Sequence, residues 1–271
     1  MTDQRSATSD GEEHVPQPTA AMRRKVVGLA TAAAVGGFLF GFDSSVINGA
    51  VDSIQHHFAL NAFVTGFIVA VALLGCAVGA YLAGRLADRW GRIRVMLIGA
   101  VLFLASSIGA GLSFSVWDLG FWRIIGGLGI GIASVVAPAY IAEIAPKQRR
   151  GGLASLQQLA ITVGIFVALL SDALLAGAAG AAANQLWLGL EAWRWMFLVG
   201  VIPSLVYGIL ALVLPESPRY LLATGRHDQA RAIFVTLVPE EDVDRQVRDI
   251  EQAIEQDKDA AKGTLRGNRF G

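Results

Sequence analysis

The stretch FVTGFIVAVALLGCAVGAYLAGRLADRWGRIR, residues 63–94, contains the two features that decide the fold. Its first part, residues 63–84, is apolar and carries no charge. A hydrocarbon core of about 30 Å is crossed by about 20 helical residues at 1.5 Å each. The remaining ten residues carry four arginines, Arg85, Arg89, Arg92 and Arg94. An apolar span followed by a short basic loop is typical of a protein that crosses the membrane several times.

Outward from this stretch, the chain contains five more apolar segments of spanning length. The six predicted spans lie near 26–47, 63–84, 95–114, 120–142, 153–176 and 194–214. Hydrophobic residues make up 54% of the 271 residues and charged residues only 16%, against about 25% in soluble domains. The sequence therefore predicts an all-α membrane protein of six transmembrane helices in the lipid bilayer. The formal net charge of zero gives no basic field that would attract nucleic acid, and none is expected as a partner.

Lysine and arginine occur in every second loop and are absent from the loops between. They precede span 1 (Arg23, Arg24, Lys25), follow span 2, and follow span 4 (Lys147, Arg149, Arg150). The intervening loops, 48–62, 115–119 and 177–193, contain neither residue type. Because basic loops stay in the cytoplasm, both termini are predicted to be cytoplasmic, in a multi-pass protein of the plasma (cell inner) membrane.

The segments outside the spans are polar. Residues 1–22 are aperiodic and predict a disordered cytoplasmic tail, whereas 23–218 comprises the bundle. Two prolines in PESPR (215–219) stop the last span, since proline lacks an amide donor. Residues 219–271 form a cytoplasmic segment in which apolar residues at helical spacing predict short amphipathic helices. A partly disordered tail is the alternative.

Two ionisable residues inside the spans are the strongest candidates for function. Asp43 lies in the outer third of span 1, and Arg123, near the start of span 4, lies at a similar depth. A charge at this depth is costly unless it has a partner or a cavity. The sequence predicts an ion pair, or a carboxylate whose proton affinity a guanidinium tunes. The alternative is that both side chains snorkel to the outer interface.

Polar side chains in spans 1 and 5 are candidates for binding a polyol. Gln157 and Gln158 lie about 10 Å into span 5, with Thr162 one turn beyond Gln158 on the same face. Phe40 lies near Asp43 and offers an aromatic face. Rings beside amides and hydroxyls suit a sugar, whose faces are apolar and whose edges are polar. The alternative is hydrogen bonding between neighbouring helices.

Acidic and basic residues are interleaved at the predicted cytoplasmic edge. They belong to three segments that lie at a similar depth, GRLADRWGRIR, EIAPKQRRG and PESPR. A charge network that forms in one conformation and breaks in another can act as a gate, although a single surface pair contributes little. The alternative is a cluster that only sets topology, against which the interleaved carboxylates argue. The candidate residues are Asp88, Arg89, Arg92, Glu143, Arg150, Glu216 and Arg219.

No constellation in the sequence predicts an enzyme. The single cysteine, Cys76, cannot form an internal disulfide or a metal cluster by itself. The glycine-rich segment RIIGGLGIGIAS (123–134) lacks the strand-turn-helix context of a dinucleotide site. No metal and no cofactor is therefore expected.

Together, these motifs resemble the sugar porter family of the major facilitator superfamily over about residues 26–260. The resemblance is carried by GFLFGFDSSVINGA in span 1, GRLADRWGRIR, RIIGGLGIGIASVVAPAYIAEIAPKQRRG from span 4, SLQQLAITVGIF in span 5, WRWMF and PESPRYL. The family implies a half-bundle of 3+3 helices related as an inverted repeat. It also implies sugar transport by alternating access.

The resemblance also implies roles for the candidate residues. Asp43 would be the proton-coupling carboxylate of a symporter and Arg123 its electrostatic modulator. Gln158 and Phe40 would contact the sugar. The charged residues at the edge would form the cytoplasmic network that stabilises the outward-facing state. A carboxylate at Asp43 favours proton symport over facilitated diffusion.

Such carriers have twelve spans, whereas this chain stops in GTLRGNRFG where a seventh span would approach. The leading hypothesis is the amino-terminal half of a proton-linked monosaccharide carrier, as a truncated product or completed by a second half-carrier chain. The alternative is a non-transporting membrane scaffold that binds a partner.

Overall fold

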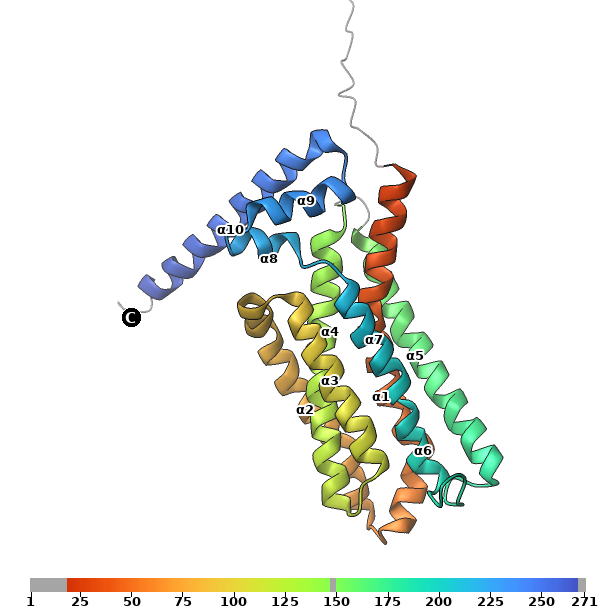
Figure 1. Cartoon of the computed structure of the whole chain (residues 1–271). Coiled ribbons are helices and arrows are strands. Elements are labelled where there is room, and N and C mark those ends of the chain that lie inside the picture. Colours follow the sequence, from red (N-terminus) through yellow and green to blue (C-terminus); the bar gives the residue numbers. More distant parts are fainter. Residues whose placement is uncertain (1–18, 147–149, 268–271) are drawn as a thin grey trace, which may run out of the picture.

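The computed structural model describes residues 19–146 and 150–267, and these residues form ten helices (Figure 1). Within the described ranges the one β feature is an isolated bridge between Gln185 and Glu191. The helices are α1 (Ala20–His57), α2 (Ala62–Trp90), α3 (Arg92–Gly111), α4 (Val116–Ile144), α5 (Arg150–Ala179), α6 (Ala192–Val199), α7 (Val201–Val213), α8 (Pro218–Ala223), α9 (His227–Leu237) and α10 (Glu240–Gly267).

Six helical segments are long and apolar enough to span a membrane, and each corresponds to one predicted span. The all-α, six-span prediction is therefore confirmed. The helices extend beyond the apolar segments. Helix α1 begins at Ala20, where Thr19 caps it, so the prediction of a disordered tail over 1–22 is wrong for residues 20–22; residues 1–18 lie outside the described residues. The sixth span consists of α6 and α7, which meet at Gly200. Pro203 explains the interruption, because it cannot donate to the carbonyl four residues earlier.

The spans form one bundle in which α1 and α4 are the most buried members. Helix α1 packs mainly against α5, whereas α4 packs mainly against α2 and α3. Figure 1 shows α8, α9 and α10 gathered at one end of this bundle, beside the start of α1. We call this end the α8 end, and the other, where α1 ends and α6 begins, the far end.

Glycines let α2 and α4 approach to backbone contact. A methyl group added at Gly79 would come within 2.3 Å of the Leu128 carbonyl oxygen on α4. In the other direction, a methyl group at Gly131 would come within 2.1 Å of the Cys76 carbonyl oxygen on α2. Such contacts fix the rotation and register of the two helices. They determine which residues face the cavity described below.

The segment after the last span is helical, as the apolar spacing predicts, but α10 is longer than the short helices expected. It has 28 residues, and its first turn carries Glu240, Glu241 and Asp242, which suit a helix N-terminus. Half-buried apolar residues of α10, including Val247 and Ile254, pack against the core. The helix contacts both α8 and α9.

Candidate functional site

The most deeply buried ion pair among the described residues joins α1 and α4. Arg123 Nη1 donates to Asp43 Oδ1 at 2.8 Å, and the two side chains are 3% and 8% exposed. The Arg123 guanidinium also lies 5.9 Å from the centre of the Phe197 ring. The geometry agrees with the pair predicted from matching depth, and neither side chain extends to the surface as the snorkelling alternative requires.

The pair borders a cavity of about 130 Å³ between α1, α2 and α4. Phe40 and Ser44 of α1 line it beside Asp43, and Cys76 lines it from α2. Arg123 Nε is buried and has no hydrogen-bond partner among the described residues. The pair is thus enclosed by protein on most sides but has access to a small space.

The span 5 candidates lie on two different faces of α5. Gln158 and Thr162 are exposed, and the Thr162 hydroxyl donates to the Gln158 carbonyl at 3.1 Å. Gln157 is buried against α1: a methyl group added at Gly37 would come within 2.7 Å of Gln157 Nε2. Its Oε1 atom has no partner among the described residues. A single step along the helix therefore separates an accessible amide from one packed between helices.

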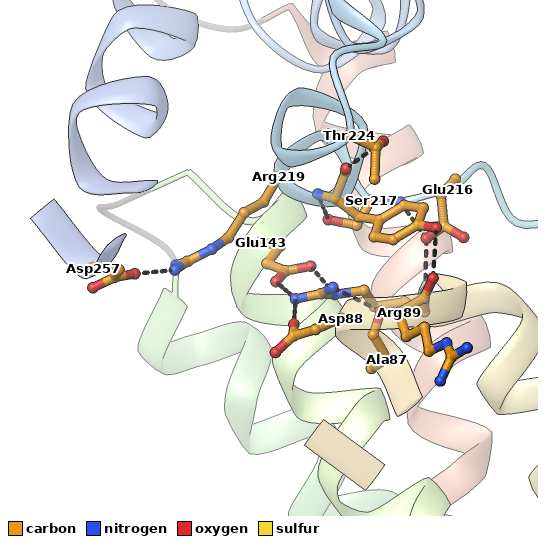
Figure 2. A network of polar contacts seen from close by, with 11 residues as sticks. Ala87, Asp88, Arg89, Glu143, Glu216, Ser217, Arg219, Thr224 and Asp257 are labelled. Carbon is orange, nitrogen blue, oxygen red and sulfur yellow. Dashed lines mark hydrogen bonds and ion pairs between the residues drawn. The ribbon is translucent and has the colours of Figure 1, made fainter. Parts of the chain in front are cut away.

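Figure 2 shows Asp88, Glu143 and Glu216 gathered at the α8 end. Arg92 contacts all three of them and is the centre of this charged network. Its Nε and Nη2 atoms donate to the two carboxylate oxygens of Glu143 at 3.1 and 2.9 Å. Nη2 also lies 3.2 Å from Asp88 Oδ1, and Nη1 donates to the Ala87 carbonyl at 3.0 Å. Because Arg92 is 9% exposed and bidentate, this contact is stronger than an ordinary surface pair.

Glu216, between α7 and α8, caps the start of α3. Its carboxylate accepts the backbone N–H groups of Arg92 at 3.0 Å and Ile93 at 3.4 Å. The capping residue of α3 is Gly91, which has no side chain to do this and adopts φ +93°. A carboxylate at a helix N-terminus satisfies unpaired amides and complements the helix dipole. The PESPR segment is thereby attached to the loop between α2 and α3.

The remaining predicted network residues are less closely joined. Arg219 Nη2 donates to Asp257 Oδ2 of α10 at 2.7 Å (Figure 2). The Arg89 side chain is exposed and forms no ion pair with any described residue, but its carbonyl accepts the Tyr220 hydroxyl at 3.4 Å. Arg150 is the first residue of α5, and its side chain lies outside the described residues.

Asp172 is a third ionisable residue inside a membrane span, in addition to Asp43 and Arg123. It falls within the predicted span 153–176 and was not among the candidates chosen from the sequence. It is 4% exposed and lies against Gly49 of α1, where an added methyl group would come within 2.5 Å of Oδ2. Neither oxygen makes a well-formed hydrogen bond to a described residue. The signal was present in the sequence: an aspartate inside an apolar stretch.

A second set of charged residues that was not predicted from the sequence forms a network at the far end of the bundle. His57 Nδ1 lies 2.7 Å from Glu191 Oε1, and Arg194 Nε donates to Glu191 Oε2 at 2.9 Å. Arg194 Nη1 also donates to the Ser113 carbonyl at 2.7 Å. The network links α1, α6 and the turn before α4. No periodicity brings these residues together, because they come from separate parts of the chain: His57 ends α1, Glu191 and Arg194 lie at the start of α6, and Ser113 precedes α4.

The family model described as "Sugar (and other) transporter" matches residues 29–269. The glucose transport protein of Synechocystis sp. is 50% identical over 257 residues, covering 94% of this chain and 55% of that protein. The D-xylose-proton symporter of Escherichia coli K12 is 34% identical, covering 85% of this chain and 51% of that protein.

Solved structures agree with the sequence comparisons. The major facilitator proton:xylose symporter XylE bound to 6-bromo-6-deoxy-D-glucose aligns with a TM-score of 0.82 at 33% identity. The alignment covers 90% of this chain and 56% of that structure. An inward-open structure of the E. coli xylose transporter aligns with a TM-score of 0.76. The chain thus spans about half the length of the relatives it matches.

Proposed function

Because the chain belongs to the sugar (and other) transporter family, we propose that it forms the amino-terminal half of a proton-coupled monosaccharide carrier working by alternating access. The observation that carries the proposal is the buried Asp43–Arg123 pair beside a cavity. Relatives described as proton symporters for xylose and arabinose support the coupling ion and the substrate class.

In this mechanism, Asp43 accepts a proton and its ion pair with Arg123 weakens. The change in local charge favours one arrangement of the two halves over the other. A membrane potential supplies about 2.3 kcal/mol per charge per 100 mV, which supports a roughly fiftyfold sugar gradient. Arg123 then stabilises the deprotonated form and returns the pair to the state seen here.

We propose that Gln158, Thr162 and Phe40 are the sugar contacts of this half. Two of them are exposed polar residues on α5, and Phe40 lines the cavity beside Asp43. Gln157, by contrast, packs against Gly37, so its role would be to hold α5 on α1.

The charged network at the α8 end is proposed to act as the gate. Arg92, Glu143 and Asp88 join α2, α3 and α4, while Glu216 and Arg219 attach α8 and α10. Opening the carrier at this end would require these contacts to separate. The basic loops at the same end favour cytoplasmic termini and a plasma-membrane location, which a carboxyl-terminal topology reporter would test.

A chimera tests the transport proposal. This chain replaces the matching segment of the Synechocystis glucose transport protein, and uptake of labelled monosaccharides is measured in vesicles with and without an inward proton gradient. We expect gradient-driven accumulation that Asp43→Asn abolishes. The matched control is Asp52→Asn, which changes an exposed carboxylate on the same helix. Accumulation that survives Asp43→Asn would refute the coupling role. A parallel assay of the chain alone distinguishes an active half from the scaffold alternative.

A further inference from the structure

A large apolar groove lies between α1, α5 and α7. Its volume is about 580 Å³, within the range of about 300–1,000 Å³ that is usual for sites that bind small molecules. Ala34 and Phe42 of α1 are buried and form its floor, whereas Leu159 of α5 and Ile202 of α7 are exposed and form its rims. The groove is therefore open along one side of the bundle.

The groove exists because its two walls are attached to α1 separately. Helix α5 is held on α1 by backbone contact, since a methyl group added at Gly164 would collide with the Phe38 carbonyl oxygen. Helix α7 packs on α3 and α1 but hardly touches α5, which meets the sixth span through α6 instead. The walls thus separate beyond Gly200, where α6 ends and Pro203 lines the groove from α7.

The lining of the groove suits hydrocarbon. Among the described residues that line it, Thr31 alone has a polar side chain, and its hydroxyl donates to the Val27 carbonyl at 2.8 Å. A sugar would lose its hydrogen bonds to water here without replacing them, whereas hydrocarbon loses none. The lining residues of α1 run from Thr31 to Phe42, about 16 Å along the helix. Because one leaflet contributes about 15 Å to the hydrocarbon core, an acyl chain matches this length.

Arg24 lies at the end of the same stripe of α1. The groove residues of α1 recur at intervals of four, three and four residues from Thr31 to Phe42, which places them on one face of the helix. The same spacing leads back through Gly28 to Arg24, about 10 Å before Thr31. A methyl group added at Gly28 would meet nothing within 4 Å, so the path from Arg24 to the groove is open.

The position of Arg24 is that of a group that binds a lipid headgroup. The interfacial layer on each side of the hydrocarbon core is about 5–8 Å thick, so the Arg24 side chain reaches the level of the headgroups. The residue is exposed and forms no ion pair with any other residue that the structure describes. A guanidinium binds a phosphate through paired hydrogen bonds. One face of α1 therefore combines a cation at the membrane surface with an apolar groove beneath it.

We propose that the groove between α1, α5 and α7 binds one acyl chain of an anionic phospholipid, and that the Arg24 guanidinium binds the headgroup phosphate of the same lipid. The groove binds the chain whatever the headgroup is, and Arg24 provides the selectivity for a negatively charged lipid. The site follows from the lining of the groove and from the stripe on α1. It does not rest on the proposed transport function.

Photolabelling tests this site. The 271-residue chain is placed in phosphatidylcholine vesicles with a trace of phosphatidylglycerol that carries a diazirine on one acyl chain, and labelled peptides are identified by mass spectrometry. The comparison probe is phosphatidylcholine with the same diazirine chain. We expect the phosphatidylglycerol probe to label groove peptides of α1 and α5 about fivefold more, because one basic residue contributes about that factor near anionic lipid. The exposed apolar face of α3 around Val101 should react equally with both probes. Equal labelling at the groove would mean contact with bulk lipid only and would overturn the proposal.

Two variants test the two parts of the site. Arg24→Gln should remove most of the preference for phosphatidylglycerol, whereas Lys25→Gln, which removes the same charge on another exposed face, should keep most of it. Val35→Trp fills the groove and should lower labelling by both probes severalfold, while Val101→Trp on α3 should leave it unchanged. An unchanged preference in Arg24→Gln, or an equal loss in Lys25→Gln, would refute the headgroup contact. If Val35→Trp fails to insert, this pair of exposed substitutions still decides the proposal.

The chimera described above tests whether the groove stays open to lipid in a complete carrier. Selective labelling that persists there would support the site. Labelling of the chain alone that disappears in the chimera would show that the second half covers the groove, and the lipid site would be wrong for the carrier. Because the readout is labelling, its outcome is separate from whether the chimera transports sugar.

Discussion

Replacing Gly91 by alanine should destabilise the protein far more than a surface glycine normally allows. Gly91 has φ +93° and ψ 163°, a conformation almost confined to glycine, and an alanine held there costs about 1–3 kcal/mol. The new methyl group would also lie 2.3 Å from Glu216 Oε2. Displacing that carboxylate removes its hydrogen bonds to Arg92 N and Ile93 N, a further loss of about 1.5–3 kcal/mol. We expect a total loss of about 2.5–6 kcal/mol.

Gly84→Ala is the matched control, seven residues earlier in α2. Gly84 is helical, and an added methyl group there meets nothing within 4 Å. Alanine at that position should raise the free energy of unfolding by about 0.5–1 kcal/mol through helix propensity. Both values can be measured by reversible unfolding in mixed dodecylmaltoside and dodecyl sulfate micelles, followed by far-ultraviolet circular dichroism.

A double-mutant cycle with Glu216→Ala separates the two contributions to the Gly91→Ala effect. In the Glu216→Ala background, Gly91→Ala should cost only the backbone strain. The loss of stability in the double variant should therefore be smaller than the sum of the two single losses by about 1.5 kcal/mol or more. A Gly91→Ala protein as stable as Gly84→Ala would refute the whole argument. Strict additivity would refute the contact with Glu216 but leave the strain.

Three further predictions concern buried charges, with stability measured in the same micelle assay. Asp43→Ala should cost about 3–5 kcal/mol because it leaves Arg123 buried without an ion-pair partner, and adding Arg123→Leu should recover most of the loss. No recovery would mean that the carboxylate acts through another group. Asp172→Asn should raise stability by on the order of 1 kcal/mol, since it removes an acid that is buried without an ion-pair partner, and a loss would contradict that description. Arg92→Lys should cost about 1–2 kcal/mol, because an ammonium cannot reproduce the bidentate contact with Glu143, and equal stability of the two proteins would show that the fork geometry is unimportant.

Apolar length alone could locate the spans, because crossing the bilayer constrains each segment independently of the others. For this reason every predicted span has a helical counterpart in the structure, and only the ends differ. The division of the sixth span at Gly200 was not predicted, although Pro203 in the sequence carried the signal. The motifs quoted for the family resemblance likewise indicate the family without knowledge of any tertiary contact, because each motif is a continuous run of residues.

Pairing between helices required the tertiary structure, with one exception. Asp43 and Arg123 could be paired because they are opposite charges at matching depth in an apolar medium, where few other partners exist. At the α8 end the sequence offered four arginines and three carboxylates at similar depth, and depth could not choose among them. The structure selects Arg92 for Glu143 and leaves Arg89 exposed.

The sequence by itself determined the number and position of the membrane-spanning helices, the class of the protein, and which polar and charged residues are candidates for function. Only the tertiary structure decided that Gln157 is buried while Gln158 is exposed, that Glu216 caps a helix 124 residues away from it, and that Cys76 lies beside Asp43. The physical reason is that hydropathy is a property of a segment. The face that a helix presents is set by its rotation, which the backbone contacts at glycines such as Gly131 fix.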